Sequence, residues 1–420
     1  MKKLFILGAG IYQVPLIKAA KNLGYYTIVT SIPGNYPGFK YADKVYYENT
    51  TDYKALLEIA KEEKIDGVLT AGTDVAVISQ GYIAENLGLI GPSFETAQIS
   101  SDKLRMKKSY EEYGVRTARY RGIQTDDENY TDKIADLELP LMFKSVDSSG
   151  SRGIVKVSSP DEFEAARNIV LANTRTDHFV VEEFVEGEEF GAQAFIQNGK
   201  LEFILPHGDY IMQGDAGVPY GHYAPYDLPD EIIEDVYLQT EKALKAMKCE
   251  NCALNADYII KDGKVYVLEI GARGGGACLM DLASIYFDFG YEDGVGGYHE
   301  MIVRHAMGEH IDFFPEDSSI MKNGVPIFTN GKLVYIKGGV ANASRMMRSD
   351  RDGVIVSLED LHEPDPDIVS VQFDYKVGDQ VRKFRVSPDR LGHVITKGKS
   401  LDDAVDLLNR TLDKIHIEIE

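Results

Sequence analysis

The sequence has few cysteines, no long apolar run, and fewer basic than acidic residues. Three cysteines in 420 residues do not indicate a disulfide framework. No apolar run approaches the ~20 residues that a membrane-spanning helix needs. The formal net charge is −22, and so acidic a surface repels phosphate backbones and anionic lipid headgroups. We therefore predict a soluble, cytoplasmic protein that binds neither nucleic acid nor membranes.

Two of the cysteines, Cys249 and Cys252, have the CxxC spacing of metal-binding and redox sites. No second Cys/His pair with zinc spacing accompanies them. The pattern therefore favours ordinary thiols over a zinc or redox centre.

The length and composition are those of an ordinary globular chain. Hydrophobic residues make up 44% and charged residues 27%, which excludes disorder over most of the length. At ~150 residues per domain, the length indicates roughly three domains.

Strands and helices alternate over the first 100 residues, which predicts a doubly wound parallel sheet. Strands are expected at 4–7, 26–30 and 67–70, helices at 12–23, 52–63 and 75–87, and a strand with a turn at 88–92.

The rest of the chain changes to an α+β pattern. A helix is expected from 101 to about 120, closed by Gly114, and is followed by a compact unit with strands at 141–144, 154–157 and 179–185 and a helix at 160–172. A second sheet unit spans 189–270 and contains a helix at 230–247. Short strands follow residue 323, and a helix at 401–415 closes the chain.

Gly8-Ala9-Gly10 follows the first strand and invites comparison with a dinucleotide-binding turn. The fingerprint needs a third small residue, but position 13 is Gln. A structural tight turn is therefore favoured over NAD or FAD binding.

Lys144 precedes a Ser/Gly loop that spans residues 145–153. Backbone N–H groups and small side chains of such a loop approach phosphate oxygens closely, and a lysine neutralises their charge. A flexible hairpin loop beside a surface lysine explains this pattern equally well.

Asp257 and Glu269 lie on two strands that flank an Asp-Gly turn. They are five and six residues from the centre of the turn, so the hairpin brings them together. Two carboxylates side by side are costly unless a cation lies between them, and hard oxygen ligands suit Mg²⁺. The alternative is a pair of acids on a solvated face.

A strand at 179–185 runs into the acidic turn 186–189. The turn fits either an exposed linker or a hinge whose backbone reads adenine while its acids hold ribose hydroxyls.

The order of these features resembles the ATP-grasp superfamily over essentially the whole chain. The resemblance rests on Lys103, Lys144 with its Ser/Gly loop, the hinge Glu182-Glu183-Phe184-Val185, the pair Asp257 and Glu269, and Arg273. Segment 8–10 resembles the domain that precedes the ATP-grasp fold, 101–104 resembles the start of the family's Asp-Lys helix, and 390–398 resembles the C-terminal module of biotin carboxylase and carbamoyl-phosphate synthetase relatives.

The resemblance assigns roles to these residues. Lys103 and Lys144 would contact ATP phosphates, and Ser149 and Gly150 would lie in a mobile loop over them. Glu182, Glu183 and Val185 would form the adenine hinge, and Glu189 would contact the ribose. Asp257 and Glu269 would be the two metal ligands. Arg273 would steady an acyl-phosphate or carboxylate.

The sequence departs from the family pattern at Gly271. The family commonly has Asn there as a further metal ligand, so a second metal ion is in doubt. In the family, a basic residue located between the hinge and the hairpin often contacts the phosphates. In this sequence only His207 and His222 are candidates for that residue.

The resemblance implies an α/β and α+β architecture: a Rossmann-like parallel sheet at 1–100, an ATP-grasp fold of two α+β subdomains at 101–310 with a mobile lid at about 118–186, and a small α+β module at 311–420. It also implies a ligase that uses ATP and Mg²⁺, with Mn²⁺ as an alternative. This ligase would join a small-molecule carboxylate to an amine or thiol through an acyl-phosphate and form ADP and phosphate.

Several alternatives remain open at this stage. One is a subunit that phosphorylates bicarbonate, as in carboxylases and carbamoyl-phosphate synthetase. Others are a catalytically inactive nucleotide-binding protein and, on the weakest grounds, a nicotinamide-dependent oxidoreductase. A homodimer is also left open, and the residues that select the substrate match no pattern.

Overall fold

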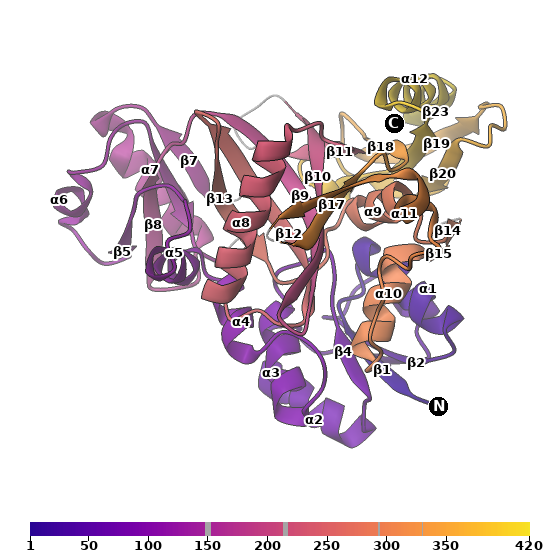
Figure 1. The fold of residues 1–420 in the computed structure, drawn as a ribbon, viewed down its shortest axis with the longest axis horizontal. Coiled ribbons are helices and arrows are strands. Elements are labelled where there is room, and N and C mark those ends of the chain that lie inside the picture. Colours follow the sequence, from indigo (N-terminus) through magenta and orange to yellow (C-terminus); the bar gives the residue numbers. More distant parts are fainter. Residues whose placement is uncertain (148–152, 213–216, 293–294, 330) are drawn as a thin grey trace.

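The computed structural model describes residues 1–147, 153–212, 217–292, 295–329 and 331–420. In Figure 1 the N-terminal region lies at the bottom, a small sheet with α5 to α7 lies at the upper left, and the last strands lie at the upper right. A large sheet occupies the centre and joins these regions.

The N-terminal region is built on a parallel sheet, as the alternating pattern predicts. Its strands have the order β3-β2-β1-β4. They are β1 (Lys3–Leu7), β2 (Tyr26–Thr30), β3 (Lys44–Tyr46) and β4 (Gly67–Leu69), and the helices between them are α1 (Val14–Asn22), α2 (Tyr53–Glu63) and α3 (Val77–Leu87). The predicted strands and helices of residues 4–87 are confirmed.

The strand expected at 88–92 is wrong. This segment connects α3 to α4 (Phe94–Ser100), a helix that the sequence analysis missed. Gly88 ends α3 in the left-handed conformation with φ 64°. The Ser93 hydroxyl caps α4 by accepting a hydrogen bond from the Thr96 N–H. Both ends of the short segment are therefore used for helix caps, which leaves no strand.

The small sheet at the upper left of Figure 1 has the order β5-β8-β6-β7. It follows α5 (Lys103–Glu112), and it consists of β5 (Tyr120–Gln124), β6 (Leu141–Ser145), β7 (Ile154–Val157) and β8 (His178–Glu183), with α6 (Tyr130–Ile134) and α7 (Phe163–Asn173). Phe143 and Val181 point into its own hydrophobic core. Because side chains alternate along a strand, Lys144 and Glu182 point to the other face, which lines a cavity.

The large sheet is antiparallel, and in the described part of the chain its order is β13-β12-β9-β10-β11-β18-β22-β20. The strands before residue 300 are β9 (Glu188–Gln197), β10 (Lys200–Ile211), β11 (Pro219–Ala224), β12 (Cys252–Lys261) and β13 (Lys264–Gly271). Ala256 and Tyr258 belong to the main core, which also includes residues of α8 (Asp230–Ala246). Asn255 and Asp257 lie on the opposite face and line the cavity.

Strands that follow residue 340 extend the same sheet. They are β18 (Ala341–Met347), β20 (Ile368–Phe373) and β22 (Gly392–Gly398), and β18 pairs with β11. A smaller sheet has the order β21-β19-β23, built from β19 (Gly353–Asp360), β21 (Gln380–Val381) and β23 (Ile415–Ile419). The large sheet therefore runs across the boundary expected at 310/311.

The helix expected at 401–415 is α12 (Leu401–Leu412), so the prediction is wrong at its end. The chain finishes in β23, whose sequence Ile-His-Ile-Glu-Ile alternates apolar and polar residues. That period of two favours a strand over a helix.

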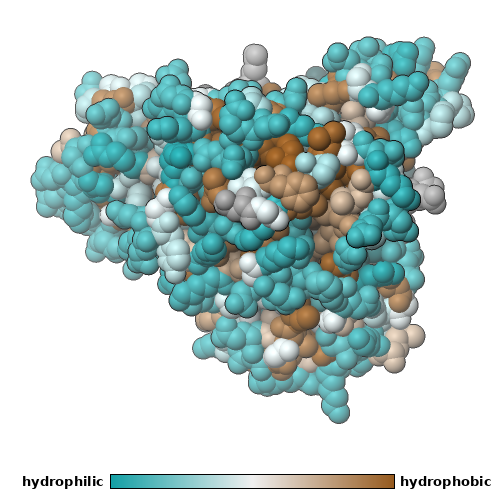
Figure 2. All heavy atoms as spheres, in the orientation of Figure 1, coloured by the Kyte–Doolittle hydropathy of each residue, from teal (hydrophilic) through white to brown (hydrophobic). Residues whose placement is uncertain are grey.

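Hydrophilic residues cover most of the face drawn in Figure 2, and hydrophobic residues gather near its centre. The centre of the view corresponds to β17 (Lys332–Lys337), which forms a hairpin with β16 (Val325–Thr329). Among the described residues, no helix combines the length and apolar character needed to cross a membrane.

Cys249 and Cys252 are both buried, between α8 and β12. Their sulfur atoms lie 3.2 Å apart, and both cysteines are free thiols.

Candidate functional site

A cavity of about 800 Å³ lies between the small sheet, the large sheet and the N-terminal region. It brings together nine of the residues expected at the site: Lys103, Lys144, Glu182, Glu183, Val185, Glu189, Asp257, Glu269 and Arg273. Ser149 and Gly150, which were expected over the phosphates, lie outside the described residues.

Asp257 and Glu269 lie directly opposite each other on β12 and β13. A bulge sets this register: Asp257 pairs with Glu269 but Tyr258 pairs with Val267, so Leu268 is the extra residue. Without the bulge, Asp257 would lie opposite Leu268. The prediction that the hairpin brings the two acids together is confirmed.

Glu269 affects the ionisation of Asp257. Burial raises the pKa of Asp257, and the negative charge of Glu269 raises it further, to about 8. Asp209 and Glu189 contribute in the same direction, and Arg273 opposes them. A site that disfavours a second negative charge in this way is suited to a bound cation.

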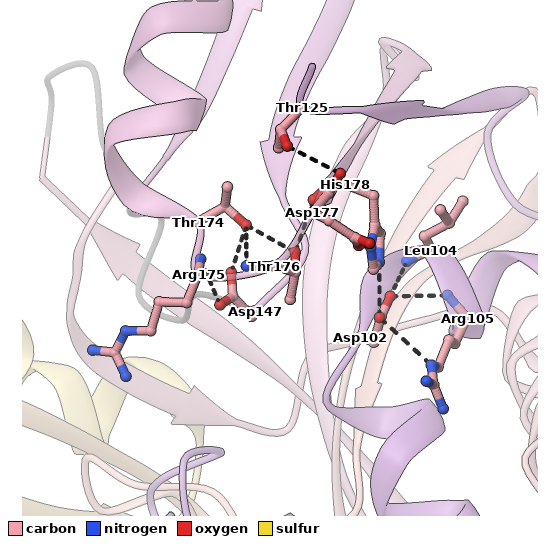
Figure 3. A network of polar contacts seen from close by, with 10 residues as sticks. All are labelled: Asp102, Leu104, Arg105, Thr125, Asp147, Thr174, Arg175, Thr176, Asp177 and His178. Atoms are coloured by element: carbon pink, nitrogen blue, oxygen red, sulfur yellow. Dashed lines mark hydrogen bonds and ion pairs between the residues drawn. The ribbon is translucent and has the colours of Figure 1, made fainter. Parts of the chain in front are cut away.

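Lys103 begins α5, and its ammonium lies 3.2 Å from Glu269 Oε2. Asp102 caps this helix, because its Oδ1 accepts hydrogen bonds from the Leu104 and Arg105 N–H groups. The second oxygen of Asp102 is 3.0 Å from Nε2 of His178 on β8 (Figure 3). The cap and the histidine together fix the start of α5, and with it Lys103, against the small sheet.

A second contact in Figure 3 holds the chain at the point where the Ser/Gly loop begins. Asp147 accepts hydrogen bonds from the Thr174 hydroxyl and the Arg175 N–H, each at 3.0 Å. Asp147, the last residue described before 148–152, is therefore anchored to the end of α7.

A buried lysine that the sequence analysis missed lies beside Lys144. Glu182 forms ion pairs with Lys144 and with Lys107, whose Nζ is 2.6 Å from the Glu182 carboxylate. Lys107 also donates to Thr117 Oγ1 at 2.6 Å. The side chains of Lys107 and Glu182 are only 4% and 2% exposed.

The two lysines decide the charge of Glu182. Burial raises the pKa of Glu182, but Lys107 and Lys144 outweigh it and bring the pKa to about 2. The side chain of Glu182 thus lies between two lysines and pairs with both. The carboxylate of Glu183 accepts a hydrogen bond from Arg119 at 2.7 Å. One signal could have revealed Lys107: it lies four residues after Lys103, on the same face of a helix.

Arg273 is held by an acid from the N-terminal region. Its Nε and Nη2 lie 2.7 and 2.9 Å from the two carboxylate oxygens of Asp74. Burial raises the pKa of Asp74, but the Arg273 guanidinium outweighs it, so the pKa is lowered. This bidentate pair joins the N-terminal region to the strand that carries Glu269.

The position of Asp74 bears on the missing Asn at 271. A Cβ atom built on Gly271 would lie 3.2 Å from Asp74 Oδ1. That distance is tighter than ordinary van der Waals contact, so a larger side chain at 271 would crowd the Asp74–Arg273 pair. The glycine leaves room for a carboxylate that comes from another part of the chain.

The turn at Gly8–Gly10 is filled by the chain itself. The Gln13 side chain accepts from the Gly10 N–H at 2.8 Å and donates to the Ala71 carbonyl at 2.5 Å. The residue that departs from the dinucleotide fingerprint therefore closes the turn.

His207 and His222, the two histidine candidates, both line the cavity. Each approaches Asp209 through its Nδ1 atom. Asp209 was not singled out from the sequence, because nothing near residue 209 indicates which strand pairs with it.

Two family models match the sequence. An ATP-grasp domain matches residues 137–281, and the C-terminal domain 2 of L-amino acid ligase matches residues 345–420. The first match covers most of the cavity residues, and the second covers β20, β22 and the end of β18 in the large sheet.

The solved structures agree with this classification. The chain is similar to a phosphoribosylglycinamide synthetase from Anaerococcus prevotii, with a TM-score of 0.81, 32% identity and complete coverage of both chains. An L-amino acid ligase from Bacillus licheniformis shares the fold, with a TM-score of 0.75, 18% identity, and coverage of 100% of this chain and 99% of that one.

A formate-dependent phosphoribosylglycinamide formyltransferase from Methanocella arvoryzae is 24% identical over 81% of this chain and 76% of its own length. Together with the cavity, these similarities define the class: the chain belongs to the ATP-grasp family. It is a ligase of the carboxylate–amine type, an enzyme that forms ADP and phosphate from ATP.

The Lys107–Glu182 pair leads to a first prediction. In Lys107→Met, Glu182 keeps its charge but has only Lys144 as a partner. We expect Glu182 then to hold Lys144 away from ATP, so the KM for ATP should rise by about tenfold or more. Breaking a buried ion pair also costs about 3–5 kcal/mol of stability, so thermal unfolding is measured beside the kinetics.

The double variant Lys107→Met/Glu182→Gln separates charge from packing. If Lys107 acts by neutralising Glu182, the double variant should recover most of the ATP affinity that the single variant loses. Lys108→Met, an exposed neighbour on the same helix, is the control and should match the wild type. Additive losses in the double variant would contradict this role.

The raised pKa of Asp257 leads to a second prediction. At pH 7, below a pKa of about 8, Asp257 is mostly protonated in the metal-free protein. Mg²⁺ binding requires the carboxylate and should therefore release close to one proton, and at pH 9 this release should fall.

Calorimetry in two buffers of different ionisation enthalpy measures the proton release. Asp257→Asn should abolish it, whereas Asp262→Asn, at the exposed turn of the same hairpin, should leave it unchanged. Equal proton release at pH 7 and pH 9 would contradict the assignment to Asp257.

Proposed function

We propose that the protein activates the carboxylate of an α-amino acid as an acyl-phosphate and transfers the acyl group to an amine. The observation that carries the proposal is the Asp257–Glu269 pair, which lies opposite across the hairpin with Lys103 against Glu269 in the same cavity. Acids for a cation and lysines for phosphates are what transfer of a phosphoryl group requires.

Asp257 and Glu269 would hold Mg²⁺, with Mn²⁺ as the alternative ion. The donor set fits, since both groups offer hard oxygen ligands and the pKa of Asp257 shows that the pair disfavours two uncompensated charges. When bound there, Mg²⁺ would supply positive charge that neutralises the phosphates.

Lys103 and Lys144 would neutralise phosphate charge, and neither would form a covalent intermediate. Val185 is buried beside the cavity, where it would pack on the adenine ring together with the backbone of Glu182 and Glu183. Glu189 is exposed to the cavity and would accept hydrogen bonds from the ribose. That Ser149 and Gly150 lie over the phosphates remains a prediction.

Arg273 would steady the carboxylate or the acyl-phosphate. Asp74 occupies its Nε–Nη2 edge, and Nη1 lies 3.4 Å from the Gly274 carbonyl oxygen. Asp74 would therefore fix the plane of the guanidinium, so that Nη1 is the group left to turn towards an anion.

The comparisons support an amino acid as the substrate that is activated. The relative named phosphoribosylamine–glycine ligase, from Thermotoga maritima, is 26% identical over 64% of this chain and 68% of its own length, and the C-terminal match is to L-amino acid ligase. Both names describe the joining of an amino acid. The amine is either a second amino acid or a phosphoribosylamine, and the experiment distinguishes them.

The experiment measures phosphate release from ATP with Mg²⁺ while amino acids are supplied singly, in pairs, and with phosphoribosylamine. Mass spectrometry identifies the product. An amide product that depends on one amino acid as the carboxylate supports the proposal, and bicarbonate is included as a separate carboxylate. ATP cleavage with bicarbonate and with no amino acid would contradict it.

Glu269→Gln provides the third prediction. The change keeps the volume and removes one negative charge, so turnover should fall at least ~10²–10³-fold, the usual cost of losing one such electrostatic contact, while the fold is retained. Glu58→Gln, at an exposed position of α2, is the matched control. Ordinary turnover in Glu269→Gln would remove Glu269 from the metal site.

Arg273→Lys provides the fourth prediction. A lysine cannot reproduce the planar fork, so amide formation should fall about 10²-fold or more while ATP affinity by calorimetry changes little. Asp74→Asn is compared because it loosens the same pair without removing the guanidinium. If the two variants lose the same activity, Arg273 acts only through Asp74.

A further inference from the structure

A cluster of His207, Asp209 and His222 lies in the cavity apart from the Asp257–Glu269 pair. Asp209 on β10 lies directly opposite His222 on β11. His207 precedes Asp209 by two residues and therefore points to the same face of the sheet. Pairing of the two strands alone thus brings two imidazoles and one carboxylate together.

The three groups converge on one point. The Nδ1 atoms of His207 and His222 lie 3.0 and 2.6 Å from the same oxygen of Asp209, and the possible ligand atoms of the cluster all lie within 4.8 Å of one another. Metal–ligand bonds of about 2.1 Å at right angles place neighbouring ligand atoms about 3 Å apart. The two distances from the histidines to Asp209 are close to this value.

Ordinary packing does not account for the histidines. His207 is 3% and His222 is 2% exposed, and within the described parts of the chain the Nε2 atoms of both are buried without a hydrogen-bond partner. Each ring thus has one partner, Asp209 at its Nδ1 atom, and a buried ring nitrogen without any partner is rare. Among these residues, the same three side chains form the one group with metal-binding geometry.

The cluster is separate from the expected Mg²⁺ site. Gly191 on β9 pairs with His207 on one side and Asp257 on the other. His207 and Asp257 are thus two strand spacings apart, about 10 Å. A Cβ atom on Gly191 would come within 2.3 Å of the His207 ring, so the glycine makes space for the imidazole on the cavity floor.

We propose that His207, Asp209 and His222 bind a divalent transition-metal ion of the Zn²⁺ or Mn²⁺ kind. Two imidazoles with one carboxylate suit such ions, whereas Mg²⁺ prefers oxygen ligands. On binding, each neutral ring gives the ion its Nδ1 lone pair and carries its one proton on Nε2, so the ring proton is kept. Three protein ligands leave coordination positions open towards the cavity. The site does not depend on the proposed function, because the ion binds without ATP or substrate.

The test uses the full chain without ATP. Bound metal is first removed with a chelator, and the protein is then dialysed against Zn²⁺ with an excess of Mg²⁺, which occupies the site of Asp257 and Glu269. Metal content is measured by mass spectrometry. We expect about one equivalent of zinc in the wild type and in Glu269→Gln, and at least a tenfold lower affinity in Asp209→Asn and His222→Gln. The matched control is His362→Gln, which changes another histidine bonded to an aspartate, Asp360.

Zinc retained at wild-type affinity by Asp209→Asn and His222→Gln would overturn the proposal, as would zinc lost in Glu269→Gln alone. Thermal unfolding checks that each variant folds. If a variant does not fold, zinc-edge X-ray absorption of the wild type decides instead. Scattering from two imidazoles is expected, and its absence would overturn the site.

Discussion

Two carboxylates held opposite each other are the constraint on which the rest of the cavity depends. Asp257 and Glu269 face each other because a bulge at Leu268 shifts the hairpin by one residue. Like charges this close must be compensated. The surrounding groups do so in part: Lys103 contacts Glu269, and Arg273 opposes the raised pKa of Asp257. The remaining negative charge is what makes the floor of the cavity a place for cations.

The cationic groups of the cavity are each paired with an acid. Asp74 in the N-terminal region holds Arg273, and Glu182 on the small sheet holds Lys107 and Lys144. A charge that is already paired in the empty cavity is pre-positioned, so less reorganisation is needed when an anion arrives. Two of the pairs, Asp74–Arg273 and Lys103–Glu269, also tie the N-terminal region and α5 to the β12–β13 hairpin and the segment after it, so the chemistry and the assembly of the fold share these contacts.

Sequence patterns predicted the features that depend on neighbouring residues. The parallel sheet of residues 1–87, β7 and the hairpin with its two acids follow from periodicity and turn chemistry. Asp74 and Asp209 could not be found this way, since their roles depend on contacts between distant segments. Lys107 was missed although it lies four residues after Lys103 on the same helix. The strand expected at 88–92 failed because helix caps at both of its ends had not been considered. Local chemistry thus located the carboxylate pair, but not the acids that hold the cations around it.

The large sheet continues without a break from β13 through β11 into β18, β22 and β20. The part of the chain from β18 onwards is therefore not an appendage that can be removed or exchanged at a loop. Cutting before β18 would leave β11 with a row of unpaired backbone groups, which is a template for aggregation. A chimera that borrows this part from a relative must preserve the register in which Ser344 faces His222. The evolution of new specificities at this end of the protein is thus restricted to changes that keep the backbone pairing of β11 with β18 intact.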